Sequence, residues 1–398
     1  MLVEIVIALI LGIIAGVFTG LTPGLHINLV GAFLISSAAI SSYNIEFIVF
    51  IVAMSITHTF LDFIPSVFIG APEEETSLSV LPGHDLLKKG RGHEAVYYTA
   101  IGGLAGILII LLFTPIFLFI LPKIEIYLKN VMFLILITAS LFLIFKKRIF
   151  WSGVTFLLAG FLGIAGLNLG IREPLLPLFS GLFGIPSILL SIKNRIRIPK
   201  QKIRKSHINF KAVKRPFLAT ILASPLCSFL PSLGSSQAAV IGSDLVGKAS
   251  KREFLFLIGS INTIVVGLSF ITLLSIGKSR TGVASFLKPA VEIISFNYLI
   301  AVILLVIILS GLLSFFLTLK ISKLIASKIN SINYTYISIV TLLFILTLTL
   351  FISGFLGIMV LVVSTSLGLF AVSINVSRSH LLGCLMLPTI LFYLPSFS

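Results

Sequence analysis

The sequence contains little charge, few cysteines and a single tryptophan. Only 11% of its 398 residues are charged, against about 25% in ordinary soluble proteins, and 58% are hydrophobic. Apolar runs of 15 to 27 residues repeat along the chain, and about 20 such residues span a bilayer. The short alternating segments of an outer-membrane barrel are absent. We therefore predict an all-α polytopic membrane protein.

The sequence also lacks the motifs of the common soluble and intramembrane enzymes. It has no phosphate-binding Gly-x-x-x-x-Gly-Lys-Ser/Thr motif and no His-Glu-x-x-His zinc motif. Its two cysteines, Cys227 and Cys384, lie in apolar runs without metal-ligand spacing or a disulfide framework. We expect both cysteines to be small buried hydrophobic residues. The sequence predicts no enzyme, no metal site and no cofactor beyond a coupling ion.

Basic residues are concentrated in a few loops. The formal net charge is +16, yet no Lys or Arg precedes Lys88, and ten of the 29 basic residues lie between Lys193 and Arg215. Basic residues crowded between apolar spans indicate orientation in a membrane. We therefore expect membrane lipids, and not nucleic acid, as their partner. The N-terminus has no basic segment or small-residue cleavage site, which predicts a retained first span.

Seven apolar segments are predicted in residues 1–192 and seven in residues 216–398, with the basic linker 193–215 between them. The segments of the first half are 2–21, 29–40, 46–68, 96–122, 131–145, 149–170 and 174–192. Those of the second half are 216–230, 236–246, 254–276, 296–319, 339–353, 355–374 and 380–394. Segments 29–40 and 236–246 are too short to cross a bilayer. Each is expected to form a re-entrant hairpin with the segment before it, alongside about five further membrane segments per half.

The distribution of charge predicts that the two halves are inverted relative to each other. Loops 88–91, 146–148 and 193–215 are basic and should face the cytoplasm. Lys251 and its basic neighbours follow the short segment of the second half, whereas the matching loop 41–44 has no basic residue. Equivalent loops therefore face opposite sides, as in the inverted repeats of secondary transporters. This assignment places both termini outside a cell membrane.

In each half the apolar runs are interrupted twice, and the number of residues between the two interruptions is nearly the same in both halves. Gly70 follows Pro23 by 47 residues, and Gly277 follows Pro231 by 46. Paired interruptions of this kind point to a transporter binding site, although a simple Pro/Gly kink is the alternative. The candidate substrate-binding residues at the two hairpin tips are Pro23, Gly24, His26 and Asn28 in the first half, and Ser232, Gly234, Ser235, Ser236 and Gln237 in the second.

The second pair of interruptions carries charges of opposite sign. Glu73, Glu74 and Glu75 occupy the first break, and they form either a gate or a solvated rim. Lys278 and Arg280 occupy the second break, where they could pair with the glutamates or hold a carboxylate. Arg280 is the better anion clamp because a guanidinium binds a carboxylate through two parallel hydrogen bonds. Small polar candidates for substrate binding in the same breaks are Gly70, Thr76, Ser77 and Thr281.

One apolar run contains an acidic residue at depth. Asp62 lies within segment 46–68, with His58 one helical turn before it. An intramembrane carboxylate is costly and is a functional hypothesis by default, here for proton or Na⁺ coupling. Asn262 occupies about the same place in the second half. A locally satisfied polar pair is the alternative for His58 and Asp62.

These motifs resemble the TctA family, the large permease subunit of tripartite tricarboxylate transporters. The family's Pro-Gly-Leu-Gly motif is similar to Pro-Gly-Leu-His at residues 23–26, and its Lys-x-Gly-Arg-x-x-Glu-Ala stretch is similar to residues 88–95. The resemblance implies a short, diverged member of archaeal type. It also implies two partners, a small membrane subunit and an extracytoplasmic binding protein. Assembly into a homo-oligomer is left open.

The function predicted first is an ion-coupled secondary transporter of a carboxylate-type anion. The substrate would bind between the two hairpin tips while the halves rock around it, with H⁺ or Na⁺ as the coupling ion. The alternative is a translocase for a lipid-linked phosphate such as a polyprenyl phosphate, because Lys278 and Arg280 suit a phosphate head group.

Overall fold

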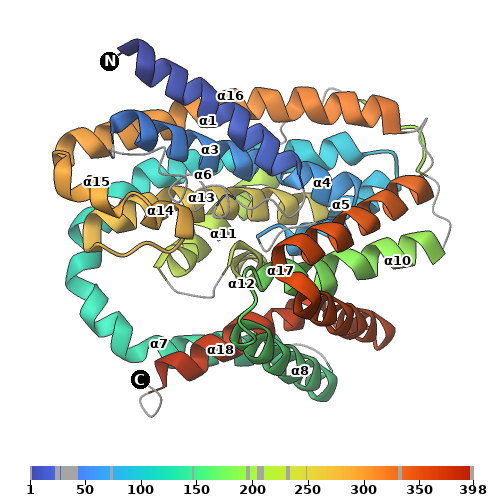
Figure 1. The fold of residues 1–398 in the computed structure, drawn as a ribbon. Coiled ribbons are helices and arrows are strands. Elements are labelled where there is room, and N and C mark those ends of the chain that lie inside the picture. Colours follow the sequence, from blue (N-terminus) through green and yellow to red (C-terminus); the bar gives the residue numbers. More distant parts are fainter. Residues whose placement is uncertain are drawn as a thin grey trace.

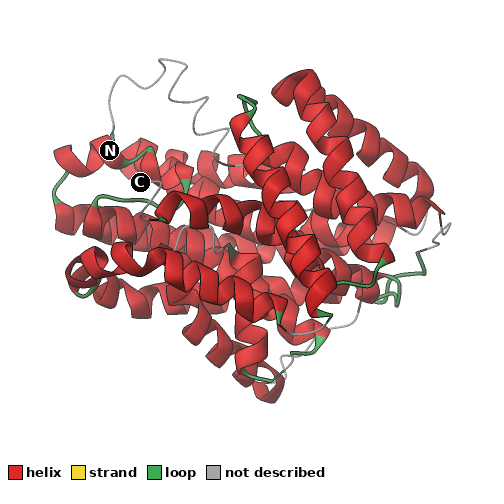
Figure 2. Ribbon diagram, turned by 90° about the horizontal axis from the view of Figure 1, so that it is seen from below, coloured by secondary structure: helices red, strands yellow, loops and turns green. Residues whose placement is uncertain are grey.

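The described part of the protein is entirely helical. The computed structural model describes residues 2–22, 27, 44–71, 75–145, 148–193, 198–203, 210–229, 234–247, 249–329 and 334–394. Over these ranges no strand occurs, and the helices stack into one bundle (Figures 1 and 2). The predicted short segment 29–40 lies outside the described residues.

The helices follow the apolar runs of the sequence. The first half contains α1 (Leu2–Leu21), α3 (Ile45–Leu61), α4 (Phe63–Phe68), η1 (Ser77–Ser79), α5 (Val80–Leu87), α6 (Gly92–Phe119), α7 (Leu121–Ile144), α8 (Ile149–Asn168), α9 (Leu175–Phe179), η2 (Ser180–Gly184) and α10 (Ile185–Lys193). The second half contains α11 (Phe210–Phe229), α12 (Ser235–Leu245), α13 (Lys251–Ile276), α14 (Gly282–Ser285), α15 (Lys288–Ile293), α16 (Phe296–Lys328), α17 (Tyr334–Ser373), η4 (Arg378–Leu382) and α18 (Gly383–Tyr393).

Among the described residues, seven helical stretches are long and apolar enough to cross a membrane. They are Leu2–Leu21, Ile45–Phe68, Gly92–Phe119, Ile149–Asn168, Lys251–Ile276, Phe296–Lys328 and Ser338–Ser373. This confirms the prediction of a polytopic all-α membrane protein. The predicted short segment 236–246 forms the 11-residue helix α12.

Three long segments are interrupted inside. Gly354 has a φ of 68°, a left-handed conformation that breaks α17 between the predicted segments 339–353 and 355–374. Asp62 separates α3 from α4 within the single segment expected at 46–68. The segment expected at 174–192 contains the π-helical turn η2, whose hydrogen bonds skip one residue more than those of an α-helix.

Helices α3 and α13 form the centre of the bundle and are buried over almost their whole length. α6 packs along α13, α16 packs along α3, α1 packs on α3 and α11 packs on α13. In Figure 1, α1 and α16 lie at the top, while α8 and α18 lie at the bottom. The outer helices expose large apolar side chains, as a lipid-facing surface requires, among them Ile14, Leu312, Phe316 and Val362.

The buried helices are held together by hydroxyl groups that bond across helices. Thr59 Oγ1 lies 3.2 Å from Thr263 Oγ1, which joins α3 to α13. Ser314 Oγ donates to Thr57 Oγ1 at 2.9 Å, which joins α16 to α3. Such bonds stabilise helix association in a membrane, where burial of apolar surface supplies little driving force.

Glycines on both helices, among them Gly102 and Gly259, allow α6 and α13 to approach closely. A Cβ on Gly102 would lie 2.2 Å from the Phe256 carbonyl oxygen, and one on Gly259 would lie 2.3 Å from the Thr99 carbonyl oxygen. Each helix thus places a glycine against the backbone of the other. Small residues at such crossings are typical of membrane helix packing.

We expect Gly259→Ala to destabilise the protein by about 1–3 kcal/mol, because the added methyl group forces α6 and α13 apart. The matched control is Gly153→Ala on α8, where a Cβ would meet only Ile144 Cγ2 at 3.9 Å. This control should be neutral or stabilising by up to about 1 kcal/mol, because alanine favours helix. The measurement is the thermal unfolding midpoint of the purified protein. Equal midpoints for the two variants would contradict the packing argument.

Candidate functional site

The first break of one half meets the hairpin tip of the other in the protein interior. Ser235 Oγ and Ser236 Oγ both donate to the Glu75 carbonyl oxygen at 3.0 Å. Ser77 Oγ lies 3.1 Å from Ser236 Oγ. The side chains of Ser77, Ser235 and Ser236 are buried. Residues predicted as substrate ligands in separate halves are therefore in direct contact, and we call residues 75–77 with 234–237 the serine junction.

Local backbone geometry explains how the junction forms. Gly234 is extended and precedes α12, so Ser235 and Ser236 lie in the first turn of that helix. On the other side, Thr76 precedes the single 3₁₀ turn η1, and Ser79 Oγ donates to the Thr76 carbonyl oxygen at 2.7 Å. Thr76 and Gln237 are also buried. Both segments thus bring polar groups and helix ends into the interior, where every such group requires a protein partner.

Asp62 and Asn262, predicted to occupy equivalent depths in the two halves, are hydrogen-bonded to each other. Asn262 Nδ2 donates to Asp62 Oδ2 at 2.8 Å, and both residues are almost fully buried. The amide supplies a donor to the carboxylate without supplying a compensating charge. The hydrogen bond joins α3 and α13 at the break between α3 and α4.

His58 lies one turn before Asp62 and contacts the first helix. Its Nδ1 lies 3.1 Å from Thr19 Oγ1 of α1. The ring is buried at the contact between α1 and α3. Any change in the relative position of these two helices would break this contact.

The basic break of the second half lies against α13 and α7. Lys278 forms an ion pair with Glu125 of α7 on an exposed part of the molecule. The backbone N–H groups of Arg280 and Thr281 both donate to Ser269 Oγ, at 3.0 and 2.9 Å. Thr281 Oγ1 accepts from the Ala284 N–H as the cap of α14. The charged partner of Lys278 in the structure is thus Glu125.

Several predicted ligands lie outside the described residues. These are Pro23, Gly24, His26, Asn28, Glu73, Glu74 and Ser232. Of the acidic triplet, Glu75 is described, and its backbone carbonyl forms the serine junction. Gly70 is described with a φ of 77° and packs against the ring of His84.

Arg378 is a buried basic residue between the predicted segments 355–374 and 380–394. Its side chain is 5% exposed, and its Nη1 donates to the Phe183 carbonyl oxygen at 3.1 Å and to Ser187 Oγ at 2.6 Å. Burial lowers the pKa of the Arg378 guanidinium to about 10, so the group stays charged at neutral pH. The one sequence signal is the polar stretch Ser-Arg-Ser-His at 377–380 between two apolar segments.

His84 is a second buried basic residue near Arg378. It is 6% exposed, and a Cβ on Gly70 would lie 2.7 Å from its Cε1. Burial lowers the pKa of His84 to about 4, with further lowering by Lys88 and Arg378 and an opposing effect of Asp85. His84 is therefore neutral at physiological pH.

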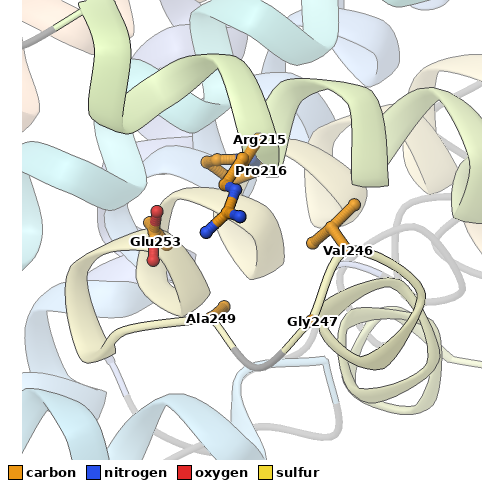
Figure 3. A pocket seen from close by; sticks show the side chains of 6 residues that line it. All are labelled: Arg215, Pro216, Val246, Gly247, Ala249 and Glu253. Atoms are coloured by element: carbon orange, nitrogen blue, oxygen red, sulfur yellow. The ribbon is translucent and has the colours of Figure 1, made fainter.

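A hollow lies between α11, the loop after α12 and the start of α13 (Figure 3). It is lined by Arg215, Pro216, Val246, Gly247, Ala249 and Glu253. None of the predicted site residues lines it, so the hollow and the serine junction are separate features. Within the described ranges, no group of three or more His, Cys, Asp or Glu residues has the arrangement of a metal site.

The membrane-length apolar helices define a polytopic α-helical membrane protein, and interruptions that meet at buried polar side chains are typical of transporters in this class. The sequence model of one transporter family, described as "Tripartite tricarboxylate transporter TctA family", matches residues 6–383. The chain belongs to this family, which confirms the resemblance inferred from its motifs, and it is a transporter and not an enzyme. An uncharacterized protein of Methanocaldococcus jannaschii, MJ1079, is 31% identical over 384 residues, with 94% of each chain covered. No solved structure matches the chain.

The low pKa of His84 predicts a pH-dependent stability. As the pH falls below 6.5, the histidine of the unfolded chain takes up a proton, whereas the folded histidine does so only near pH 4. Protons therefore favour unfolding in this window, and the wild type should lose about 3 kcal/mol relative to His84→Gln between these pH values. The measurement is the thermal midpoint of both proteins across the window. Parallel pH curves would mean that His84 titrates normally.

Proposed function

We propose that the protein is an ion-coupled secondary transporter that moves a carboxylate-type anion by alternating access. The serine junction carries the proposal, since it brings two helix interruptions from different halves into contact in the bundle interior. Unwound segments at such depth are typical of substrate sites in transporters, because they present free backbone groups and helix ends to a ligand. The description of the matched family supports a tricarboxylate as the substrate class.

The pattern of helix contacts supports two related halves. If α1, α3 and α6 correspond to α11, α13 and α16, each contact has a counterpart. α1 packs on α3 as α11 packs on α13, and α6 packs on α13 as α16 packs on α3. We propose that residues 1–192 and 216–398 are inverted repeats, each with a re-entrant hairpin. Helix α11 begins at Phe210, so the proposed linker 193–215 overlaps its start.

Contacts between loops support the proposed orientation on the cytoplasmic side. Lys202 N of the basic linker donates to the Gly90 carbonyl oxygen at 2.7 Å, in the basic loop 88–91. Lys251 pairs with Asp85, which joins the loop after α12 to the same region. The three loops carry basic residues and would all face the cytoplasm.

Contacts on the other side agree with this orientation. Lys278, after α13, pairs with Glu125 near the start of α7. Ser353 Oγ, at the break in α17, donates at 3.1 Å to the carbonyl oxygen of Glu173, which follows α8. Each of these contacts joins positions that the proposed topology assigns to the outside. The proposed topology, with both termini outside the cell membrane, is thus consistent with the described packing.

We propose Asp62 as the coupling residue, with Asn262 as its hydrogen-bond donor. Its carboxylate is buried at the break between α3 and α4, where a proton or Na⁺ would neutralise it. His58 contacts α1, so a movement of α1 would displace His58, which lies one helical turn before Asp62. Glu73 and Glu74 remain candidate gate residues on sequence grounds.

The family description also supports partners for this permease. We propose that it works with a small membrane subunit and an extracytoplasmic binding protein, and that the latter delivers the anion to the outer face. The translocation of a polyprenyl phosphate is less favoured, because the charge of Lys278 is compensated by Glu125.

The first test is exchange of citrate by the full chain in proteoliposomes. Vesicles loaded with unlabelled citrate should accumulate labelled citrate, and Ser235→Ala/Ser236→Ala should slow this exchange about tenfold or more. The reason is that the variant loses two hydrogen bonds of about 1 kcal/mol each at the junction. The matched control is Ser327→Ala, whose exposed hydroxyl bonds only the Leu324 carbonyl oxygen within its own helix.

Citrate exchange should be unchanged in the control. Absence of citrate exchange together with translocation of polyprenyl phosphate across the same vesicles would overturn the carboxylate assignment in favour of the lipid-linked substrate.

The second test concerns coupling. Asp62→Asn should abolish uphill accumulation of citrate driven by a proton or Na⁺ gradient while exchange at equal concentrations persists, because the variant keeps its shape but loses the titratable charge. The matched control is Asp85→Asn, whose carboxylate is half-exposed and paired with Lys251. Gradient-driven uptake at the wild-type rate in Asp62→Asn would show that this carboxylate is structural.

A further inference from the structure

Arg378 is a buried cation without a described counter-charge. Its two hydrogen bonds, to the Phe183 carbonyl oxygen and Ser187 Oγ, both use Nη1 and both go to neutral acceptors. Among the described residues, no carboxylate pairs with it, and its buried Nε has no hydrogen-bond partner. Neutral acceptors orient the guanidinium, but they do not neutralise it.

An uncompensated charge in this environment is unfavourable. Transfer of an ion from water into a protein interior carries a desolvation penalty, which a partner of opposite charge partly offsets. The edge of the guanidinium formed by Nε and Nη2 remains for such a partner. That edge matches the two oxygens of a carboxylate or phosphate group, which it binds through parallel hydrogen bonds.

His84 adds a second unpartnered polar atom to the same region. Its Nε2 is buried and has no hydrogen-bond partner among the described residues. Lys88, which directly follows the same helix, and Arg378 on η4 act on this ring as positive charges, and Asp85 acts as the opposing one. The region around the ring therefore has an excess of positive charge.

Arg378 and His84 are connected to the serine junction through the interrupted helices. Phe183 belongs to η2, which contacts η1, and Arg378 begins η4, which contacts α12. In the serine junction, residues 75 and 76 directly precede η1 and Ser77 begins it, while Ser235 begins α12. Four interruptions of regular helix, contributed by both halves of the chain, thus converge on one region.

We propose that Arg378 and His84 bind an oxyanion group of the transported substrate, whose negative charge neutralises the guanidinium. The anion would bridge Nε and Nη2 of Arg378 and accept a hydrogen bond from Nε2–H of His84. This inference rests on the proposed function and specifies which side chains of the site supply the charge. The serines of the junction would then contact uncharged parts of the substrate.

The test measures thermal stabilisation of the purified full chain in lipid nanodiscs by three probes at matched ionic strength. The probes are citrate, inorganic phosphate and a polyprenyl phosphate included in the lipid. At least one should raise the unfolding midpoint of the wild type in a saturable manner. Arg378→Gln should weaken that apparent affinity tenfold or more, whereas Arg378→Lys should retain part of it because a charge remains.

The matched control is Arg148→Gln, since Arg148 also donates through Nη1 to a backbone carbonyl, that of Ile374, but on an exposed loop. Its anion response should equal that of the wild type. Without any anion, Arg378→Gln should be at least as stable as the wild type, because it removes a buried charge. A lower midpoint without anions, with an unchanged anion response, would identify Arg378 as purely structural and overturn the proposal.

Glu73 and Glu74 lie outside the described residues and provide a second control. If either supplies the counter-charge, an anion response would emerge only in the double variant Glu73→Gln/Glu74→Gln, which would overturn the proposal. Stabilisation by citrate or phosphate identifies a soluble anion, and stabilisation by polyprenyl phosphate alone identifies a lipid head group. Citrate exchange at the wild-type rate in Arg378→Gln would reject this inference while leaving the proposed function intact.

Discussion

Polar backbone groups at helix ends require partners within the protein, because lipid offers none, and this requirement shapes the interior of the bundle. The Glu75 carbonyl oxygen accepts from Ser235 and Ser236, and the Phe183 carbonyl oxygen accepts from Arg378. In both cases the partner comes from the other half of the chain. The interruptions that we propose for the substrate site are therefore also points where the two halves of the chain are joined.

The interior contains two kinds of polar group. The hydroxyls of α3, α13 and α16 bond to one another across helices, as Thr57 does with Ser314, and they stabilise the bundle without charge. Asp62, between α3 and α4, and Arg378, in η4, differ from them because each is ionisable. In the proposed mechanism these two residues act on the coupling ion and the substrate, whereas the hydroxyl pairs stabilise the packing of the helices.

Much of this architecture could be predicted from the sequence, because hydropathy and backbone preference act locally. The long apolar runs predicted the membrane helices, and Gly354 interrupts α17 between two predicted segments. The depth of Asp62 and Asn262 was also predictable, although their hydrogen bond depends on how α3 and α13 pack. Arg378 was not identified as a site residue. Its burial depends on Phe183 and Ser187, which are about 190 residues away in the sequence.

The π-helical turn η2 constrains how this chain can change during evolution. Residues 180–184 hold one residue more per turn than an α-helix would, which sets the rotation of everything that follows in α10. Loss of a single residue here would restore a regular helix and rotate Ser187 by about 100° away from Arg378. A single substitution in this turn leaves the rotation of α10 unchanged, whereas a deletion would move Ser187 Oγ away from the Arg378 guanidinium. The length of this segment should therefore tolerate less variation than its composition.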